Sequence, residues 1–261
     1  MTVYIFDNTL DGLLTAVFDA FALHQIPEQL LTCSEQLPLF ATNIHHVQTD
    51  DTKATRVWTG LEKHLSADAL SIITISWQSE EIALNMPLFS FICKVFRSEN
   101  KNIIHNTADP DVLAVRNTCR RVLHEVLRMK QFIRFQKAKD GTYLAVVSPD
   151  HNVLPLITDH FQERFNDQSW LIFDAKRHYG YYYTAEGAEP TRITFADATT
   201  LPFNLSNGKL NADILSADDQ LFQDLWRTYF KAICIRERLN PRKQLNDMPR
   251  RYWRYMTEKN G

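Results

Sequence analysis

The hydrophobic pattern of the first 65 residues predicts one buried strand and two helices. The apolar run Val3–Phe6 is typical of a short buried strand, and turn-forming residues follow it. Asp11 is expected to cap a helix that begins near Gly12 and is apolar almost all round as far as Leu23. Such a helix should lie in the core. Apolar residues at spacings of three and four predict a second helix over residues 51–65.

The pattern between residues 25 and 130 predicts helices and irregular chain. Residues 25–43 are expected to be irregular, and residues 66–77 are predicted as a helix although their β-branched run favours a strand. A helix over residues 80–96 should kink or split at Pro87. The clearest helix begins at Asp109-Pro110. Its apolar seam is formed by Val112, Val115, Cys119, Val122, Val126 and Met129.

Two antiparallel hairpins are predicted in the second half of the chain. Residues 132–138 and 143–148 flank Asp140-Gly141, a strong hairpin signal. A second pair of strands, 170–174 and 179–184, is joined by a short polar turn. A helix is expected near residues 154–165. Another is expected from Ser216 to Ile233, with an inward face of Leu221, Phe222, Leu225, Trp226 and Phe230.

These elements predict an α+β fold, in which a mostly helical chain carries a small antiparallel sheet built from two hairpins. Because no linker is visible, we expect a single domain over residues 1–261. Its parts would be a helical first half (1–130), a hairpin sheet with helices (131–235) and a basic C-terminal tail (236–261).

Composition narrows the functional class only slightly. The 44% hydrophobic and 23% charged fractions are ordinary for a globular protein. Neither a GxGxxG nor a GxxxxGK[ST] pattern occurs, and no cofactor is predicted. The four cysteines are far apart, and no segment resembles a signal peptide or a membrane span. We therefore expect a cytoplasmic protein without a membrane partner.

The charges are segregated along the chain. The net charge is −2, yet residues 1–110 carry −7, residues 111–139 carry +6, residues 140–235 carry −6 and residues 236–261 carry +5. Arg116, Arg120, His124 and Arg128 follow at every fourth position of the 110–130 helix, while Glu125 is expected to pair with neighbouring arginines. If the two basic blocks meet in the fold, they form one positive surface.

The C-terminal stretch interleaves arginines with aromatic residues, at Arg250, Arg251, Tyr252, Trp253 and Arg254. Guanidinium groups grip phosphate and aromatic rings stack on bases, so the stretch is a candidate for nucleic-acid contact. The alternative is that the aromatic residues dock the tail on its own domain while the arginine stems cover the edges.

Candidates for catalysis are weak. Asp150-His151 and Asp159-His160 are acid–histidine pairs, but a metal site needs three or four converging ligands, and turns or helix caps explain these residues equally well. The same holds for Asp7. No catalytic residue and no metal ligand is assigned, and whether the chain is an enzyme stays open.

Three groups of motifs together resemble a known family. They are Arg120-Arg121-Val122 with Glu125, Arg128-Met129-Lys130, Phe132 and Arg134-Phe135; Pro149-Asp150-His151 with Val153–Leu156, Phe161, Arg164-Phe165 and Trp170–Ile172; and Asn240-Pro241-Arg242 with Met248–Trp253. The chain resembles the bacterial DUF4130 family of DNA-metabolism proteins, and the likeness extends over nearly the whole chain, including Gly12 and Leu13.

The resemblance implies a role in DNA metabolism or repair, with a radical S-adenosylmethionine (SAM) protein as partner. Some relatives are fused to a uracil-DNA glycosylase-like domain, which this sequence lacks, so base excision would need a separate partner. The first hypothesis is a DNA-binding accessory protein. Its predicted nucleic-acid contacts are Arg120, Arg121, Arg128, Arg134, Arg242, Arg250, Arg251, Tyr252, Trp253 and Arg254. The alternatives are a protein scaffold for that partner without DNA contact, and an enzyme on nucleic acid that uses Asp7, Asp150 or His151.

Overall fold

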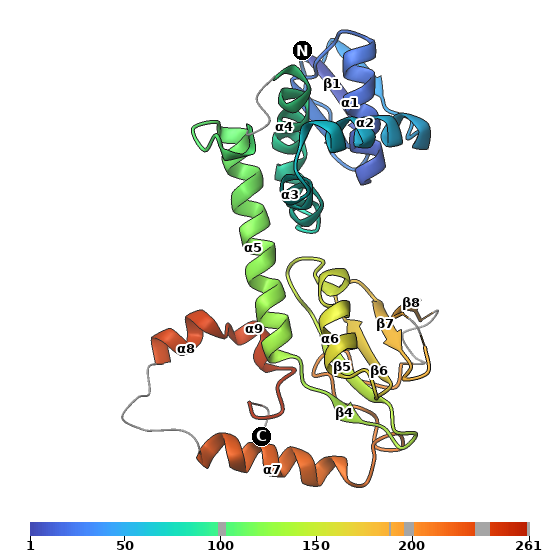
Figure 1. Ribbon diagram of the computed structural model, residues 1–261, viewed down its shortest axis with the longest axis vertical. Helices are drawn as coiled ribbons and strands as arrows, with labels where there is room; N and C mark the ends of the chain where they lie inside the picture. The colour runs from blue at the N-terminus through green and yellow to red at the C-terminus, as the bar shows by residue number, and fades with distance from the viewer. Residues whose placement is uncertain (99–102, 188, 196–200, 233–240, 260–261) are drawn as a thin grey trace. The chain divides into compact units, whose positions relative to one another are not determined.

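The computed structural model describes residues 1–98, 103–187, 189–195, 201–232 and 241–259. The chain forms two compact units, Met1–Leu123 and His124–Gly261, and helix α5 (Pro110–Phe132) contributes residues to both (Figure 1). The assignment of a single domain stays a prediction.

The first unit contains a three-stranded parallel sheet with the order β2-β1-β3. Strand β1 (Thr2–Phe6) is central, and β2 (Gln29–Thr32) and β3 (Asn43–His46) pair with it on either side. The strand β1 was predicted. The expectation of irregular chain over residues 25–43 was wrong for β2 and for the start of β3, whereas residues 33–42 form neither helix nor strand. Both missed strands have four residues and β3 is largely exposed, so they show neither a long apolar run nor a clear alternation.

Among the described residues, four helices lie wholly within the first unit, together with short 3₁₀ turns at Ile82–Leu84 and Ile103–His105. They are α1 (Leu10–Ala22), α2 (Asp51–His64), α3 (Ala67–Trp77) and α4 (Asn85–Arg97). Their inward faces join β1 in one hydrophobic core. Two local predictions were wrong. Thr9, not Asp11, caps α1 by accepting a hydrogen bond from the Gly12 N–H, and Pro87 lies in the first turn of α4, where a missing N–H costs no bond.

The second unit is organised around a five-stranded sheet with the order β4-β5-β6-β7-β8. Its strands are β4 (Gln136–Lys137), β5 (Tyr143–Val147), β6 (Trp170–Asp174), β7 (Tyr179–Tyr183) and β8 (Thr191–Thr194). Both predicted hairpins are present, as β4–β5 and β6–β7, and Gly141 has the positive φ of 88° that the first turn requires.

The α+β class is confirmed, but the detail of a purely antiparallel sheet was wrong. Strands β5 and β6 are parallel, in register from Tyr143 opposite Trp170 to Val147 opposite Asp174. The connection between them contains a 3₁₀ turn (Leu154–Leu156) and helix α6 (Thr158–Arg164). A parallel pair needs a crossover of this kind, whereas two hairpins in sequence suggest a meander.

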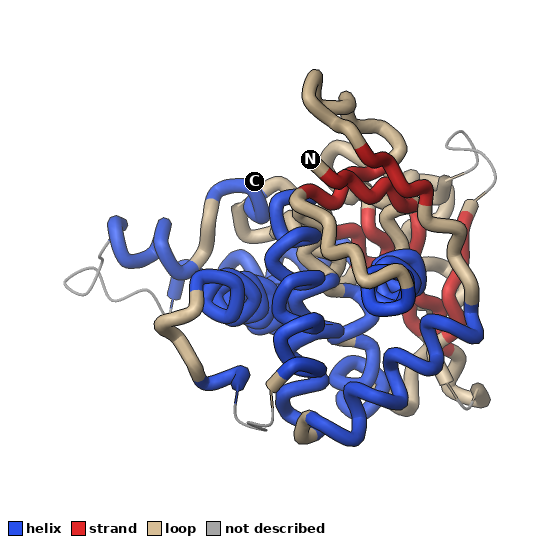
Figure 2. Tube along the Cα trace, turned by 90° about the horizontal axis from the view of Figure 1, so that it is seen from above, coloured by secondary structure: helices blue, strands red, loops and turns tan. Residues whose placement is uncertain are grey.

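In the described part of the chain the sheet is followed by helices α7 (Asp219–Ala232), α8 (Pro241–Asp247) and α9 (Arg250–Trp253). Helices predominate over strands in the described chain (Figure 2). The expected inward face of α7 was wrong, since Leu221 and Phe222 are 59% and 61% exposed and Leu225 and Trp226 are exposed as well. The side chain of Phe230, and Ile233 and Asn240, lie outside the described residues. None of the helices that the structure describes has the length and apolar character to cross a bilayer.

A carboxylate links the end of β1 to the start of two helices. Asp7 accepts hydrogen bonds from the Thr9 N–H and hydroxyl at 3.0 and 2.7 Å and from the Thr49 hydroxyl at 2.8 Å. Burial alone would raise the pKa of Asp7, but these donors outweigh it and lower the pKa below its ordinary value. A Cβ on Gly12 would lie 2.1 Å from Asp7 Oδ1. The glycine therefore leaves room for the carboxylate.

We predict that Gly12→Ala lowers the free energy of unfolding by about 1–3 kcal/mol, because the new methyl group displaces the Asp7 carboxylate from its donors. Urea unfolding followed by circular dichroism measures this loss. The double variant Asp7→Ala/Gly12→Ala removes the clash and should lose less than the sum of the two single changes. Additive losses would contradict the assigned contact.

Candidate nucleic-acid interface

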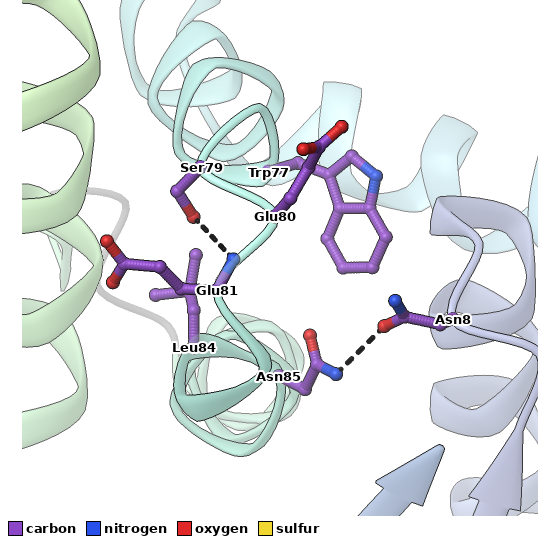
Figure 3. A pocket seen from close by; sticks show the side chains of 7 residues that line it. All are labelled: Asn8, Trp77, Ser79, Glu80, Glu81, Leu84 and Asn85. Carbon is purple, nitrogen blue, oxygen red and sulfur yellow. Dashed lines mark hydrogen bonds between the residues drawn. The ribbon is translucent and has the colours of Figure 1, made fainter. Parts of the chain in front are cut away.

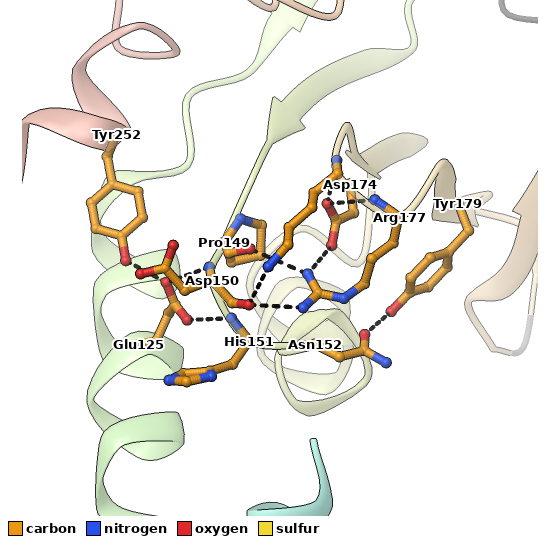
Figure 4. A network of polar contacts seen from close by, with 10 residues as sticks. Glu125, Pro149, Asp150, His151, Asn152, Asp174, Arg177, Tyr179 and Tyr252 are labelled. Carbon is orange, nitrogen blue, oxygen red and sulfur yellow. Dashed lines mark hydrogen bonds and ion pairs between the residues drawn. The ribbon is translucent and has the colours of Figure 1, made fainter. Parts of the chain in front are cut away.

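The buried carboxylate of Glu125 lies at the centre of the second unit's polar network (Figure 4). Glu125 is on α5 and is 1% exposed. Its Oε1 accepts hydrogen bonds from the Tyr252 hydroxyl at 2.5 Å and from the Asp150 N–H at 2.9 Å, and its Oε2 accepts one from the His151 N–H at 2.7 Å. One side chain thus joins α5, the turn after β5 and α9.

Arg251, on α9, also belongs to this network. Its Nη2 lies 3.4 Å from Glu125 Oε1 and 3.0 Å from Asp150 Oδ2, and it donates to the Tyr252 hydroxyl at 2.7 Å. The guanidinium group also covers the Tyr252 ring at 4.6 Å from its centroid. Arg251 is therefore paired with two carboxylates of the chain, the buried Glu125 and the exposed Asp150. The alternative that the C-terminal aromatic residues dock on their own domain holds for Tyr252, which is buried.

The protonation states follow from these contacts. Burial by itself raises the pKa of the Glu125 carboxyl, but the Tyr252 hydroxyl and the two backbone N–H groups outweigh it, so the pKa lies below its ordinary value. Burial and then the neighbouring Glu125 carboxylate raise the pKa of Tyr252 well above its ordinary value. At neutral pH Glu125 is therefore an ionised carboxylate, and it accepts a hydrogen bond from the protonated Tyr252 hydroxyl.

A second internal ion pair ties the chain end to the region after α5. Arg134 Nη2 lies 2.7 Å from Glu258 Oε1, and Arg134 Nη1 donates to the carbonyls of Gln131 and Ile133. Its guanidinium group lies 5.4 Å from the Trp226 ring centroid. Like Arg251, Arg134 has its donors directed at protein atoms.

The arginines of α5 that were predicted to form a basic ridge also have different partners. Arg120 and Arg121, in the first unit, are both exposed, and Arg121 pairs with Glu81 at 2.5 Å and donates to the Thr118 hydroxyl at 3.0 Å. The expected pairing of Glu125 with Arg121 or Arg128 was wrong. Glu125 faces the protein interior, whereas Arg121 reaches Glu81 and Arg128 reaches the carbonyl of Asn246.

The contact of Arg128 with α8 brings two basic segments together within the second unit. Arg128 Nη2 donates to the Asn246 carbonyl at 3.0 Å, across 118 residues of sequence. Arg242 lies one turn before Asn246 on α8, and Arg250 opens α9 four residues after it. Arg242, Arg250 and Arg254 are exposed. We call Arg128, Arg242, Arg250 and Arg254 the cationic cluster.

The aromatic members of the predicted interface are mostly internal. The Trp253 indole N–H donates to the Met248 carbonyl at 3.0 Å, and Trp253 is half-buried. Arg250 lies 5.9 Å and Lys259 4.8 Å from its ring centroid. Arg254 covers Tyr255 at 4.8 Å. The rings hold cations near the surface, while Tyr252 is too deeply buried to stack on a base.

The candidate catalytic pairs have structural partners. Asp150 pairs with Arg251, and the His151 N–H donates to Glu125. Asp174 pairs with Arg177, whose Nη2 also donates to the Asp150 carbonyl (Figure 4). Over the described ranges no three His, Cys, Asp or Glu side chains are grouped so that they could hold a metal ion.

A comparison with protein-family models gives a match that covers the family motifs identified in the sequence. The family model of DUF4130, a domain of unknown function, matches residues 84–258, about two thirds of the chain.

The chain belongs to the DUF4130 family.

The DUF4130 match contains the Glu125 network and the cationic cluster. It begins at residue 84, so the expected likeness at Gly12 and Leu13 lies outside it. A search of curated proteins gave no match.

Sequence reasoning missed Glu125 as the central residue of this DUF4130 unit, although a signal was present. Glu125 lies three residues after Val122 and four before Met129, both of which are buried members of the apolar seam. A carboxylate at such a position faces the interior, where it needs internal donors. The distant donors themselves, on Tyr252 and at residues 150–151, give no local signal.

We predict that Glu125→Gln lowers the free energy of unfolding by about 1.5–3 kcal/mol at neutral pH, because an amide replaces one charged acceptor oxygen by a donor. The folded-state pKa of Glu125 is below its unfolded value of about 4.5. Its contribution is therefore present above that value and is lost as pH falls through the folded pKa. Urea unfolding of both proteins over a pH series measures the difference.

The exposed Glu163, on α6, provides the control. Glu163→Gln should have little effect at any pH. A loss for Glu125→Gln that is equally large in acid and at neutral pH would contradict a charged Glu125.

Proposed function

We propose that this DUF4130 protein is an accessory protein of DNA metabolism that binds the phosphate backbone of nucleic acid through its cationic cluster. The observation that carries the proposal is the hydrogen bond from Arg128 to the Asn246 carbonyl, because it joins a cation of α5 to the basic segment of α8 and α9. Clustered guanidinium groups on rigid elements are suited to phosphate.

The pairing of some arginines with carboxylates of the chain suggests which arginines contact phosphate. Arg121, Arg134 and Arg251 each have a carboxylate partner within the chain. Removing such a cation would leave a carboxylate unpaired, so we assign these three to structural support. Phosphate contact is assigned to the exposed Arg242, Arg250 and Arg254, with Arg128 beside them. Arg120, exposed in the first unit, stays a predicted contact.

Contacts of this kind give affinity without sequence specificity. Guanidinium groups bind phosphates of any sequence, whereas base readout needs side chains that reach base edges or unstacked bases. Tyr252 is buried and Trp253 already donates to the backbone, so neither is assigned to base readout. A separate enzyme would then supply the chemistry, and the family resemblance suggests a radical SAM or uracil-DNA glycosylase-type protein.

We predict that the protein binds fluorescein-labelled single- or double-stranded oligonucleotides in a fluorescence anisotropy titration, with an affinity that falls steeply as salt rises. Arg242→Ala/Arg250→Ala should weaken binding at low salt. On duplex DNA it should also reduce the slope of log affinity against log salt by about 2, one unit for each lost phosphate contact.

The control removes two exposed cations elsewhere, by Lys63→Ala/Arg192→Ala on α2 and β8. It makes the same change in net charge and should leave the salt slope unchanged. No binding at low salt, or equal effects of the two double variants, would overturn the proposal. The first result would leave the protein–protein scaffold as the remaining hypothesis.

A further inference from the structure

A cavity in the first unit lies outside the nucleic-acid proposal. It encloses about 240 Å³ and is lined by Asn8, Trp77, Ser79, Glu80, Glu81, Leu84 and Asn85 (Figure 3). These residues come from the turn after β1, the segment after α3 and the start of α4. All but Leu84 and Asn85 precede the range that the DUF4130 family model matches.

The cavity adjoins the carboxyl end of the central parallel strand. From β1 the chain passes through α1 to β2 on one side, and it then crosses to β3 on the other side of β1. In open α/β sheets, ligands bind outside the carboxyl ends of strands where the strand order reverses in this way. Asn8 belongs to the turn at that position and has a left-handed backbone with φ 60°.

Asn85 presents an unused acceptor to the cavity. The residue is 3% exposed, and its Nδ2 donates to Asn8 Oδ1 at 3.1 Å. Its amide oxygen points into the cavity (Figure 3) and accepts no hydrogen bond from any residue that the structure describes. Because this oxygen faces the cavity and meets no protein donor, a ligand or solvent molecule in the cavity can donate to it.

The other side chains that line the cavity favour a positively charged ligand. The Glu80 carboxylate lies beside the Trp77 indole, whereas the Glu81 carboxylate points away from the cavity and pairs with Arg121 (Figure 3). None of the seven side chains that line the cavity is cationic. An anionic ligand would therefore meet acceptors and a like charge, while a cation would gain both Glu80 and the indole.

The size and the apolar walls favour an organic ion over a metal ion. Hard metal ions take six or more oxygen ligands. Because Glu81 pairs with Arg121 and Asn8 Oδ1 accepts from Asn85, the side-chain oxygens left to face the cavity are those of Ser79, Glu80 and Asn85, beside Trp77 and Leu84. Such walls suit a short hydrocarbon stem with N–H donors at its end.

We propose that this cavity binds a small organic cation that carries N–H donors, of the alkylammonium or alkylguanidinium class. The N–H groups donate to the Asn85 amide oxygen, the positive charge lies near Glu80, and the stem lies against Trp77 and Leu84. The site is independent of the cationic cluster, so either proposal can fail without the other.

The test uses the full chain labelled with ¹⁵N and titrated with butylammonium, butylguanidinium or butyrate in matched salt. The Trp77 indole signal is assigned with Trp77→Phe. With at least one of the two cations, we expect saturable shifts of the Trp77 indole and Asn85 side-chain amide signals. Butyrate should cause none.

Two variants make the test specific. Glu80→Gln should weaken cation binding by about fivefold, because the exposed carboxylate contributes a modest attraction. Glu62→Gln, an equal charge change at an exposed position of α2, should leave binding unchanged. Because Glu80 is exposed, its variant is expected to fold. Absence of saturation with both cations, equal binding of butyrate, or equal behaviour of the two variants would overturn the proposal.

Discussion

The second unit depends on the hydrogen bonds that stabilise one buried charge, the carboxylate of Glu125. A carboxylate removed from water is costly unless hydrogen bonds replace its hydration, and Glu125 receives them from a phenol and two backbone N–H groups, with Arg251 nearby. These donors belong to segments about 25 and 127 residues away in sequence. The requirement therefore fixes where α9 and the turn at residues 149–151 meet α5.

The same requirement explains why arginines of one motif have different roles. Arg250, Arg251 and Arg254 are all exposed, but Arg251 is held between Glu125 and Asp150. Tyr252 points inward to Glu125 and Arg251 reaches the same carboxylate, while Arg250, on the same short helix, lies against Trp253. An internal anchor thereby presents cations at the surface, and the Arg128–Asn246 contact adds a cation from α5 to them.

The sequence predicted those helices and hairpins that are determined by periodicity and turn residues within the element itself. The long helix from Pro110, both hairpins and the helical character of residues 67–77 were predicted from periodicity and turn residues. The parallel pairings of β1 with β2 and β3, and of β5 with β6, were not, because they join segments without a shared turn. The exposed face of α7 was misread because periodicity shows that a helix has an apolar face but not whether that face is covered.

For the candidate site, the sequence showed which residues are basic but not how they are used. Charge counting located both positive segments, and the structure brings Arg128 to α8. The sequence could not show that Arg251 and Arg134 pair with carboxylates, since their partners Glu125 and Glu258 are more than 120 residues away along the chain. The cavity beside Asn85 likewise joins three segments that are separate in sequence.

Amide hydrogen exchange at residues 150 and 151 tests most directly whether Glu125 organises the second unit. Both N–H groups donate to its carboxylate, and neither belongs to a helix or strand that would protect it otherwise. The account predicts slow exchange of both amides in the native protein, and fast exchange of both in Tyr252→Phe/Glu125→Ala under native conditions. Fast exchange in the unaltered protein, at the rate of an exposed loop, would contradict it.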